Sequence, residues 1–121
     1  MSVKILIADD EPNIVVSLEF MMKREGYGVL VARDGVEALA MIRRERPRLV
    51  LLDGMMPGMT GFDVCAAVRA DADIRDTLIV MLTAKGRETD LARGAGVGVD
   101  AYVTKPFSTR DLVAKVREML G

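Results

Sequence analysis

Short runs of apolar residues alternate along this chain with longer stretches whose apolar residues recur at helical spacing. Runs of this length are typical of strands, and the stretches between them are typical of amphipathic helices. Most runs lack alternating polar residues, so each predicted strand is covered on both faces, as in a parallel sheet. The predicted strands cover residues 3–8, 28–32, 49–52, 78–82 and 99–103. Strands and helices in this order predict an α/β, doubly wound fold around a five-stranded parallel sheet.

Five helices are predicted between and after these strands. The first spans about residues 12–25 and has a proline in its first turn, where proline is tolerated. The second opens at Asp34, the third follows Thr60 and the last opens at Ser108, and each is a good N-cap residue. The fourth, at about residues 87–95, ends among glycines, which cost roughly 1 kcal/mol relative to alanine inside a helix. We expect this fourth helix to be short and mobile.

Length and composition exclude several classes of protein. A chain of 121 residues makes one domain, over residues 1–121, and its formal net charge of −1 argues against direct nucleic-acid binding. There is no histidine, so catalysis by histidine and zinc sites built on histidine are excluded. The single cysteine, Cys65, cannot form an internal disulfide, and we expect it to be buried in a protein of the cytoplasm. No apolar run approaches the roughly 18 residues of a membrane span.

Polar residues follow the predicted strands where each one ends. Asp9 and Asp10 follow the first strand and Asp53 follows the third. Thr83 follows the fourth strand, and Lys105 comes shortly after the fifth. Ligands of open α/β sheets bind beyond the carboxyl ends of the strands. The sequence therefore predicts that three carboxylates, a hydroxyl group and an ammonium group meet at one edge of the sheet.

This set of groups is suited to phosphoryl chemistry. Three carboxylates repel one another unless a cation or protons relieve them, and an all-oxygen ligand set suits Mg²⁺. A cation and an ammonium group can bind phosphoryl oxygens while a hydroxyl group donates to another of them. An aspartate can itself be the nucleophile and form an aspartyl-phosphate. Each residue alone is more typical of a cap, a turn or a solvated charge than of a site, so the prediction depends on their convergence.

Several motifs, in order and at fitting spacing, resemble the receiver domain of two-component response regulators, such as the chemotaxis regulators. The resemblance covers the whole chain. The motifs are Asp9-Asp10-Glu11-Pro12, Leu51-Leu52-Asp53 with Met56-Pro57-Gly58 and Gly61, Thr83-Ala84, and Tyr102-Val103-Thr104-Lys105-Pro106-Phe107. The resemblance implies a flavodoxin-like receiver fold with strand order 2-1-3-4-5, and a signalling domain that does phosphorelay chemistry on itself rather than an enzyme acting on other substrates.

The resemblance also implies roles for the acidic residues. Asp53 is the implied phospho-acceptor, which receives a phosphoryl group from a sensor histidine kinase or a histidine phosphotransfer protein. Mg²⁺ would be ligated by Asp10, by Asp53 and by the backbone carbonyl of Met55, and Asp9 would act through a water molecule. Two departures from the family pattern, Gly54 after the acceptor and a threonine where many members have an acid, are expected to affect loop rigidity rather than activity.

Three further residues have implied roles in the switch. Lys105 would pair with Asp53 and then with the phosphoryl group, and its peptide bond to Pro106 is expected to be cis. Thr83 would reach a phosphoryl oxygen on activation, and Tyr102 would then turn inward. The implied output surface comprises the fourth helix, the fifth strand and the fifth helix. It would control an unknown partner or output domain and is also compatible with a homodimer.

Four residues are expected to affect either kinase docking or the lifetime of the phosphoryl group. Val16 and Phe20 lie off the core stripe of the first helix and are candidates for docking the kinase, although Phe20 could instead pack on the last helix. Met55 and Lys85 lie two residues after the acceptor and the threonine, and we expect them to control water access and hence phosphoryl lifetime.

Three other functions use similar parts. An aspartate-nucleophile phosphatase of the haloacid dehalogenase type would need a second aspartate two residues after the nucleophile, where this chain has Met55. A flavodoxin-like cofactor binder needs a neutral, hydroxyl-rich phosphate loop after its first strand, whereas this loop is acidic. A pseudo-receiver, which binds proteins without taking up phosphate, would have no need for the complete set of acceptor residues.

Overall fold

The computed structural model describes residues 3–84 and 97–121 of the chain. Its sheet has five parallel strands in the order β2-β1-β3-β4-β5, which confirms the predicted fold class and strand order. The strands are β1 (Lys4–Ala8), β2 (Gly28–Ala32), β3 (Leu49–Asp53), β4 (Leu78–Ala84) and β5 (Ala101–Lys105). Because β2 and β5 form the two edges, β1, β3 and β4 make the buried centre of the sheet.

Four helices lie in the described part of the chain. They are α1 (Pro12–Arg24), α2 (Gly35–Glu45), α3 (Gly61–Ala70) and α5 (Thr109–Leu120). The helices α2, α3 and α5 begin at the predicted caps, since the side chains of Asp34, Thr60 and Ser108 each accept a hydrogen bond from the backbone N–H three residues later. The predicted helix at 87–95 lies outside the described residues.

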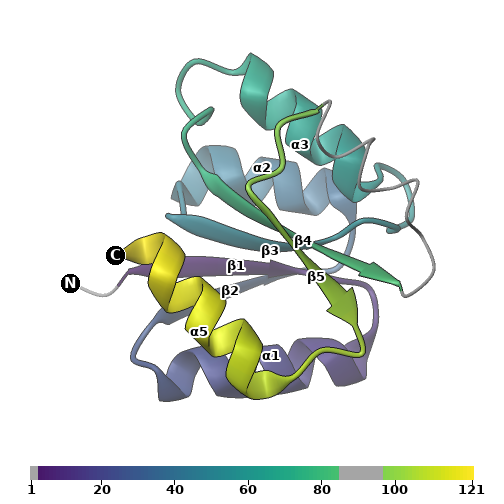
Figure 1. Cartoon of the computed structure of the whole chain (residues 1–121). Coiled ribbons are helices and arrows are strands. Elements are labelled where there is room, and N and C mark those ends of the chain that lie inside the picture. The colour runs from purple at the N-terminus through teal and green to yellow at the C-terminus, as the bar shows by residue number, and fades with distance from the viewer. Residues whose placement is uncertain (1–2, 85–96) are drawn as a thin grey trace.

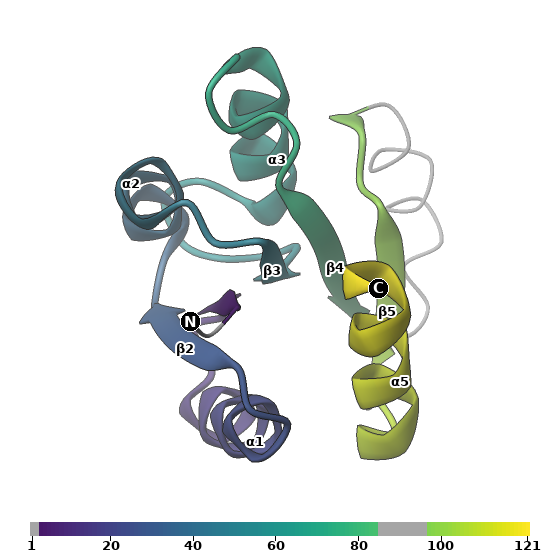
Figure 2. The same ribbon diagram turned by 90° about the vertical axis from the view of Figure 1, so that its left-hand side faces the viewer.

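The helices cover the sheet in two layers. Figure 2 shows α2 and α3 on one face and α1 and α5 on the other. Strand residues alternate between the faces, so each face has its own apolar core. The core of the α2–α3 face includes Leu6, Leu52, Phe62 and Met81. The core of the α1–α5 face includes Ile7, Leu51, Leu82, Leu18 and Val116.

Three strands extend further than their apolar runs predict. β3 includes Asp53, β4 continues to Ala84, and β5 runs over Ala101–Lys105 rather than 99–103. The apolar runs end where polar site residues begin, but the ladder is made by backbone groups and continues past that point. As a result, the site residues Asp53, Thr83 and Lys105 lie within strands, where the sheet holds their backbones in place.

Candidate functional site

The predicted site residues meet at the carboxyl edge of the sheet. Figure 1 shows the arrowheads of β4 and β5 on the same side of the molecule, and β1 and β3 run parallel to them. Adjacent strands place Asp9 and Asp10, which follow β1, beside Asp53 at the end of β3. Carboxylate oxygens of these three residues all lie within 4.8 Å of one another, which is close enough for them to share one cation.

Asp9 is the most buried of the three acids. Its side chain is fully buried, and both oxygens have partners: Oδ1 accepts from the Glu11 backbone N–H at 2.9 Å, and Oδ2 accepts from Lys105 Nζ at 3.0 Å. Asp10, by contrast, is exposed. Asp10 therefore presents its carboxylate toward solvent, whereas Asp9 is held inside by two hydrogen bonds.

Asp53 lies between these acids and Lys105. It is largely buried, its Oδ1 accepts a hydrogen bond from the Met55 backbone N–H at 3.1 Å, and its Oδ2 lies 3.5 Å from Lys105 Nζ. Burial raises the pKa of Asp53 to about 6, because desolvation and the negative charges of Asp9 and Asp10 outweigh the Met55 hydrogen bond and the positive charge of Lys105. The ionised carboxylate is thus held at an energetic cost that a bound cation would relieve.

Lys105 joins Asp9 and Asp53 across the site. Burial by itself would lower the pKa of its ammonium group, but the hydrogen bond to Asp9 and the charges of both carboxylates raise the pKa above its ordinary value. Lys105 is therefore positively charged at neutral pH. The peptide bond between Lys105 and Pro106 is cis, as the resemblance implies.

Thr83 and Tyr102 lie on the α2–α3 face of the sheet, near the acids. Thr83 is buried near the end of β4, and Tyr102 on β5 is half-buried and packs against the core of that face. Because the register pairs Met81 with Tyr102, the two candidate switch residues lie on neighbouring strands two positions apart. Side chains two positions apart on adjacent strands can influence each other's packing.

The remaining predicted residues lie around the rim or outside the described part. Met55 is 47% exposed beside Asp53, and Val16 and Phe20 are 66% and 67% exposed on α1. Phe20 borders a hollow between α1 and α5 that Thr109 and Val113 also line, so it lies beside the last helix without being covered by it. Lys85 lies outside the described residues.

The donor set fits a hard divalent cation. The three clustered acids offer only carboxylate oxygens, which suit Mg²⁺ and not a metal that prefers nitrogen or sulfur. Asp9 has a hydrogen bond to each of its carboxylate oxygens, whereas Asp10 is exposed.

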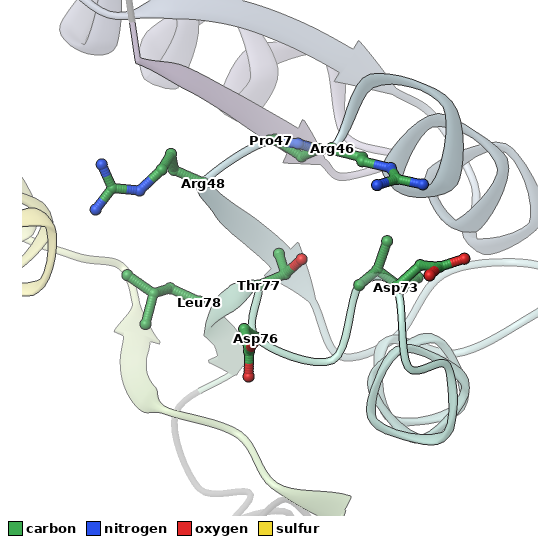
Figure 3. A pocket seen from close by; sticks show the side chains of 8 residues that line it. Arg46, Pro47, Arg48, Asp73, Asp76, Thr77 and Leu78 are labelled. Carbon is green, nitrogen blue, oxygen red and sulfur yellow. The ribbon is translucent and has the colours of Figure 1, made fainter.

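A separate cavity of about 420 Å³ lies at the opposite, amino edge of the sheet, between the segments that lead into β3 and β4. Figure 3 shows that its two arginines, Arg46 and Arg48, point away from each other, and Asp73 and Asp76 also line it. With two opposed arginines and two acids, the cavity lacks the convergent charge of an anion site. It contains none of the predicted site residues.

Sequence reasoning missed two contacts of the site. It paired Lys105 with Asp53 but did not anticipate the shorter bond to Asp9. It also missed how tightly α3 packs on the acceptor: a Cβ atom added at Gly61 would lie 2.2 Å from the Asp53 carbonyl oxygen. The glycine in the motif after Asp53 was the available signal for this close approach.

Comparisons with known proteins agree with this geometry. A family model described as response regulator receiver domain matches residues 5–117. Chemotaxis protein CheY4 of Vibrio cholerae is 32% identical, with a TM-score of 0.90 and 98% of each chain covered. A CheY-like response regulator receiver domain protein from Methanospirillum hungatei JF-1 is 31% identical, with a TM-score of 0.91 and 99% of this chain and 94% of that chain covered. The signal receiver domain of a histidine kinase from Syntrophus aciditrophicus is 29% identical, with a TM-score of 0.92 and 98% and 90% covered.

Proposed function

The chain belongs to the response regulator receiver domain family of two-component signalling, and from that premise we propose that Asp53 is its phospho-acceptor. The observation that carries this proposal is the position of the Asp53 carboxylate. It lies at the end of a central strand, 3.5 Å from the ammonium group of Lys105 and clustered with two further carboxylates. This is the arrangement that a carboxylate nucleophile needs for an incoming phosphoryl group.

The proposed reaction is transfer of a phosphoryl group from a phosphohistidine. An Asp53 carboxylate oxygen attacks phosphorus, the bond from nitrogen to phosphorus breaks, and the imidazole leaves with the electron pair and takes up a proton. Lys105 exchanges part of its contact with Asp9 for the new phosphoryl oxygens, which are stronger acceptors. Mg²⁺ held by Asp10, Asp53 and the Met55 backbone carbonyl, with Asp9 acting through water, would supply positive charge next to the same oxygens.

We propose that Thr83 and Tyr102 convert this local change into a surface change. The phosphoryl group brings extra charge and acceptor oxygens to the end of β3, one strand away from Thr83. The Thr83 hydroxyl donates to one of these oxygens and moves toward β3, and the Tyr102 ring occupies the space that it leaves. The result is a shift between two populated states of the surface around β5 and α5.

The proposed partners follow from the same surfaces. A sensor histidine kinase or histidine phosphotransfer protein would dock on α1 next to the acidic edge, where Val16 and Phe20 expose apolar side chains. The output surface that the resemblance implies, of which β5 and α5 are the described part, would control an output partner or a homodimer, without direct contact to nucleic acid. In the described part of the chain, none of the helices is long and apolar enough to cross a bilayer. A cytoplasmic location fits a partner of this kind.

One experiment tests the acceptor directly. The full chain is incubated with Mg²⁺ and acetyl phosphate, and its intact mass is compared with that of Asp53→Asn. We expect one added phosphoryl group, about 80 Da, in the wild type and none in the variant, and we expect metal chelation to prevent the addition. Addition that persists in Asp53→Asn would place the acceptor elsewhere.

The same assay separates two alternatives. A pseudo-receiver would show no added mass under any condition, and an aspartate-nucleophile phosphatase would turn over a small phosphoester such as p-nitrophenyl phosphate many times per chain. The residue two positions after Asp53 disfavours the phosphatase, because Met55 has no titratable group to act as general acid.

A further inference from the structure

We propose that Arg69 positions β5 for phosphoryl binding, because it holds the segment that leads into β5 against α3 and the start of β4. The inference rests on the proposed function, since its consequence is read at Lys105. Figure 1 shows the segment before β5 beginning next to α3, while β5 itself ends at the same edge as β4. Arg69 lies near the end of α3, far along the chain from every proposed site residue on β5.

The guanidinium group of Arg69 makes four hydrogen bonds. Nε donates to the Gly98 carbonyl at 2.9 Å, and one terminal nitrogen donates to the Arg75 and Thr77 carbonyls at 2.7 and 2.8 Å. The other terminal nitrogen donates to Asp100 Oδ2 at 2.7 Å. Three segments therefore meet on one planar group, whose rigid fork of donors no other side chain offers.

The acceptors are arranged for this arginine. Gly98 has a φ of +87°, and a Cβ atom there would lie 3.2 Å from Arg69 Nε, so the arginine lies where a side chain would otherwise be. Asp100 Oδ2 also accepts from the Ile79 backbone N–H at 2.7 Å, and the Asp100 N–H donates to the Ile79 carbonyl at 3.0 Å. We call Arg69, Gly98 and Asp100 the Arg69 clamp. It anchors the entry of β5 to both α3 and β4.

The clamp matters because β5 is an edge strand. Among the described strands it pairs only with β4, and none of its residues belongs to the fully buried core. From Ala101 to Lys105 the strand extends roughly 13 Å, so its entry and the Lys105 site are the two ends of one short, stiff element. Displacement of the entry along the strand is transmitted to Lys105, whose contacts to Asp9 and Asp53 are 3.0 and 3.5 Å long. Asp9 and Asp10 follow β1 and Asp53 ends β3, whereas the hydrogen bonds of the clamp join α3, the start of β4 and the entry of β5.

This separation yields a specific test. The full chain is titrated first with Mg²⁺ alone and then, at saturating Mg²⁺, with beryllofluoride as a phosphoryl analogue, and amide chemical shifts report binding. Arg69→Met keeps the aliphatic stem and removes the donors, and Asp100→Ala removes their carboxylate partner. We expect the Mg²⁺ Kd of both variants to stay within about twofold of wild type, and the beryllofluoride Kd to rise at least about fivefold, since about 1 kcal/mol corresponds to that factor.

Two further variants sharpen the comparison. Asp100→Asn keeps an oxygen that can accept from Arg69 and Ile79, so we expect its beryllofluoride Kd to lie between those of wild type and Asp100→Ala. Arg43→Met is the matched control. Arg43 also pairs with an acid at the end of α3, since its Nε lies 3.3 Å from Asp71 Oδ2, but it is not part of the clamp. We expect the control to bind both ligands as wild type does.

The outcomes are distinct. If Arg69→Met and Asp100→Ala lower the melting temperature but leave the beryllofluoride Kd unchanged, the clamp is only structural and the inference is overturned. A parallel loss of Mg²⁺ and beryllofluoride affinity overturns it as well, because the effect then does not pass through β5. If Arg69→Met fails to fold, the graded series from Asp100→Asn to Asp100→Ala decides. If wild type binds Mg²⁺ but no beryllofluoride, the proposed function itself has failed.

Discussion

Lys105 lies closer to Asp9 than to Asp53: its Nζ is 3.0 Å from Asp9 Oδ2 and 3.5 Å from Asp53 Oδ2. Before phosphorylation the ammonium group thus balances the fully buried acid first and the acceptor second. The Asp53 carboxylate is therefore paired with Lys105 less tightly than the Asp9 carboxylate is. It also makes the stability of the folded protein depend on a contact between two ends of the chain.

The pair between Lys105 and Asp9 predicts a strong thermodynamic coupling. Lys105→Met leaves the buried Asp9 without its ammonium partner, and we expect it to destabilise the protein by about 2–4 kcal/mol. Asp9→Asn in the Lys105→Met background removes the unpaired charge and should restore much of that loss. Urea unfolding of the two single variants and the double variant measures the coupling. Additive effects of the two substitutions would contradict the pairing.

The raised pKa of Asp53 predicts that the free energy of unfolding depends on pH. The pKa is about 6 in the folded protein and near 3.8 in a free side chain, so the folded state binds the Asp53 proton more tightly. This group's contribution to stability is therefore fully present below about pH 4 and is lost as pH rises through about 6. Asp53→Asn should raise the metal-free melting temperature at pH 7 by several degrees and change it little at pH 4.

Calorimetry at several pH values, with and without Mg²⁺, checks this prediction. Addition of Mg²⁺ at pH 7 should stabilise wild type and reduce its difference from Asp53→Asn, because a bound cation relieves the repulsion among the acids. An equal change in melting temperature at pH 4 and pH 7 would count against the assigned cause.

The close approach at Gly61 predicts a different response at two neighbouring glycines. Gly61→Ala would place Cβ 2.2 Å from the Asp53 carbonyl oxygen, whereas Gly54→Ala would place it 3.3 Å from the ring of Phe62. We expect Gly61→Ala to displace the acceptor, destabilise the fold by about 2–4 kcal/mol and slow phosphorylation by acetyl phosphate. Gly54→Ala serves as the control and should cost less than about 1 kcal/mol. Equal costs at the two positions would refute this account.

Met55 is predicted to protect the acyl phosphate. Its side chain is exposed beside Asp53, where it can limit the approach of water. Met55→Asn introduces an amide that can hydrogen-bond a water molecule, and we expect hydrolysis of the phosphorylated protein to be several-fold faster. Met55→Leu keeps an apolar side chain and should leave the rate near that of wild type. Phosphate release after removal of acetyl phosphate measures both rates, and an unchanged rate for Met55→Asn would reject the shielding role.

We predict that the apolar side chains exposed on α1 are needed for phosphotransfer from a donor protein but not for phosphorylation by a small molecule. Val16→Ala combined with Phe20→Ala removes both exposed side chains, and we expect phosphotransfer from a phosphorylated histidine phosphotransfer domain to slow at least about tenfold. Phosphorylation by acetyl phosphate should not change. Val36→Ala is the control, because Val36 is 60% exposed but lies on α2, across the sheet. Equal slowing with both phosphodonors would point to the acceptor site instead of docking.

Much of the architecture was predictable because it depends on local pattern. Unbroken apolar runs identified the strands, and Asp34, Thr60 and Ser108 identified three helix starts through contacts only three residues long. The end of β5 was predicted two residues too early, because polar residues that continue a ladder carry no apolar signal. The expected mobile helix at 87–95 and the role of Lys85 fall outside the described residues and remain predictions.

By itself, the sequence determined which chemical groups meet: parallel strands must bring their carboxyl ends to one edge, and these strands end in acids, a threonine and a lysine. Tertiary structure alone decided how those groups share their charge. The bond from Lys105 to Asp9 joins residues 96 positions apart, and the Arg69 clamp joins α3 to the entry of β5. The burial that raises the pKa of Asp53 likewise exists only in the folded chain. Such contacts depend on distances that tertiary packing sets between residues far apart in the chain, and local sequence patterns carry no information about those distances.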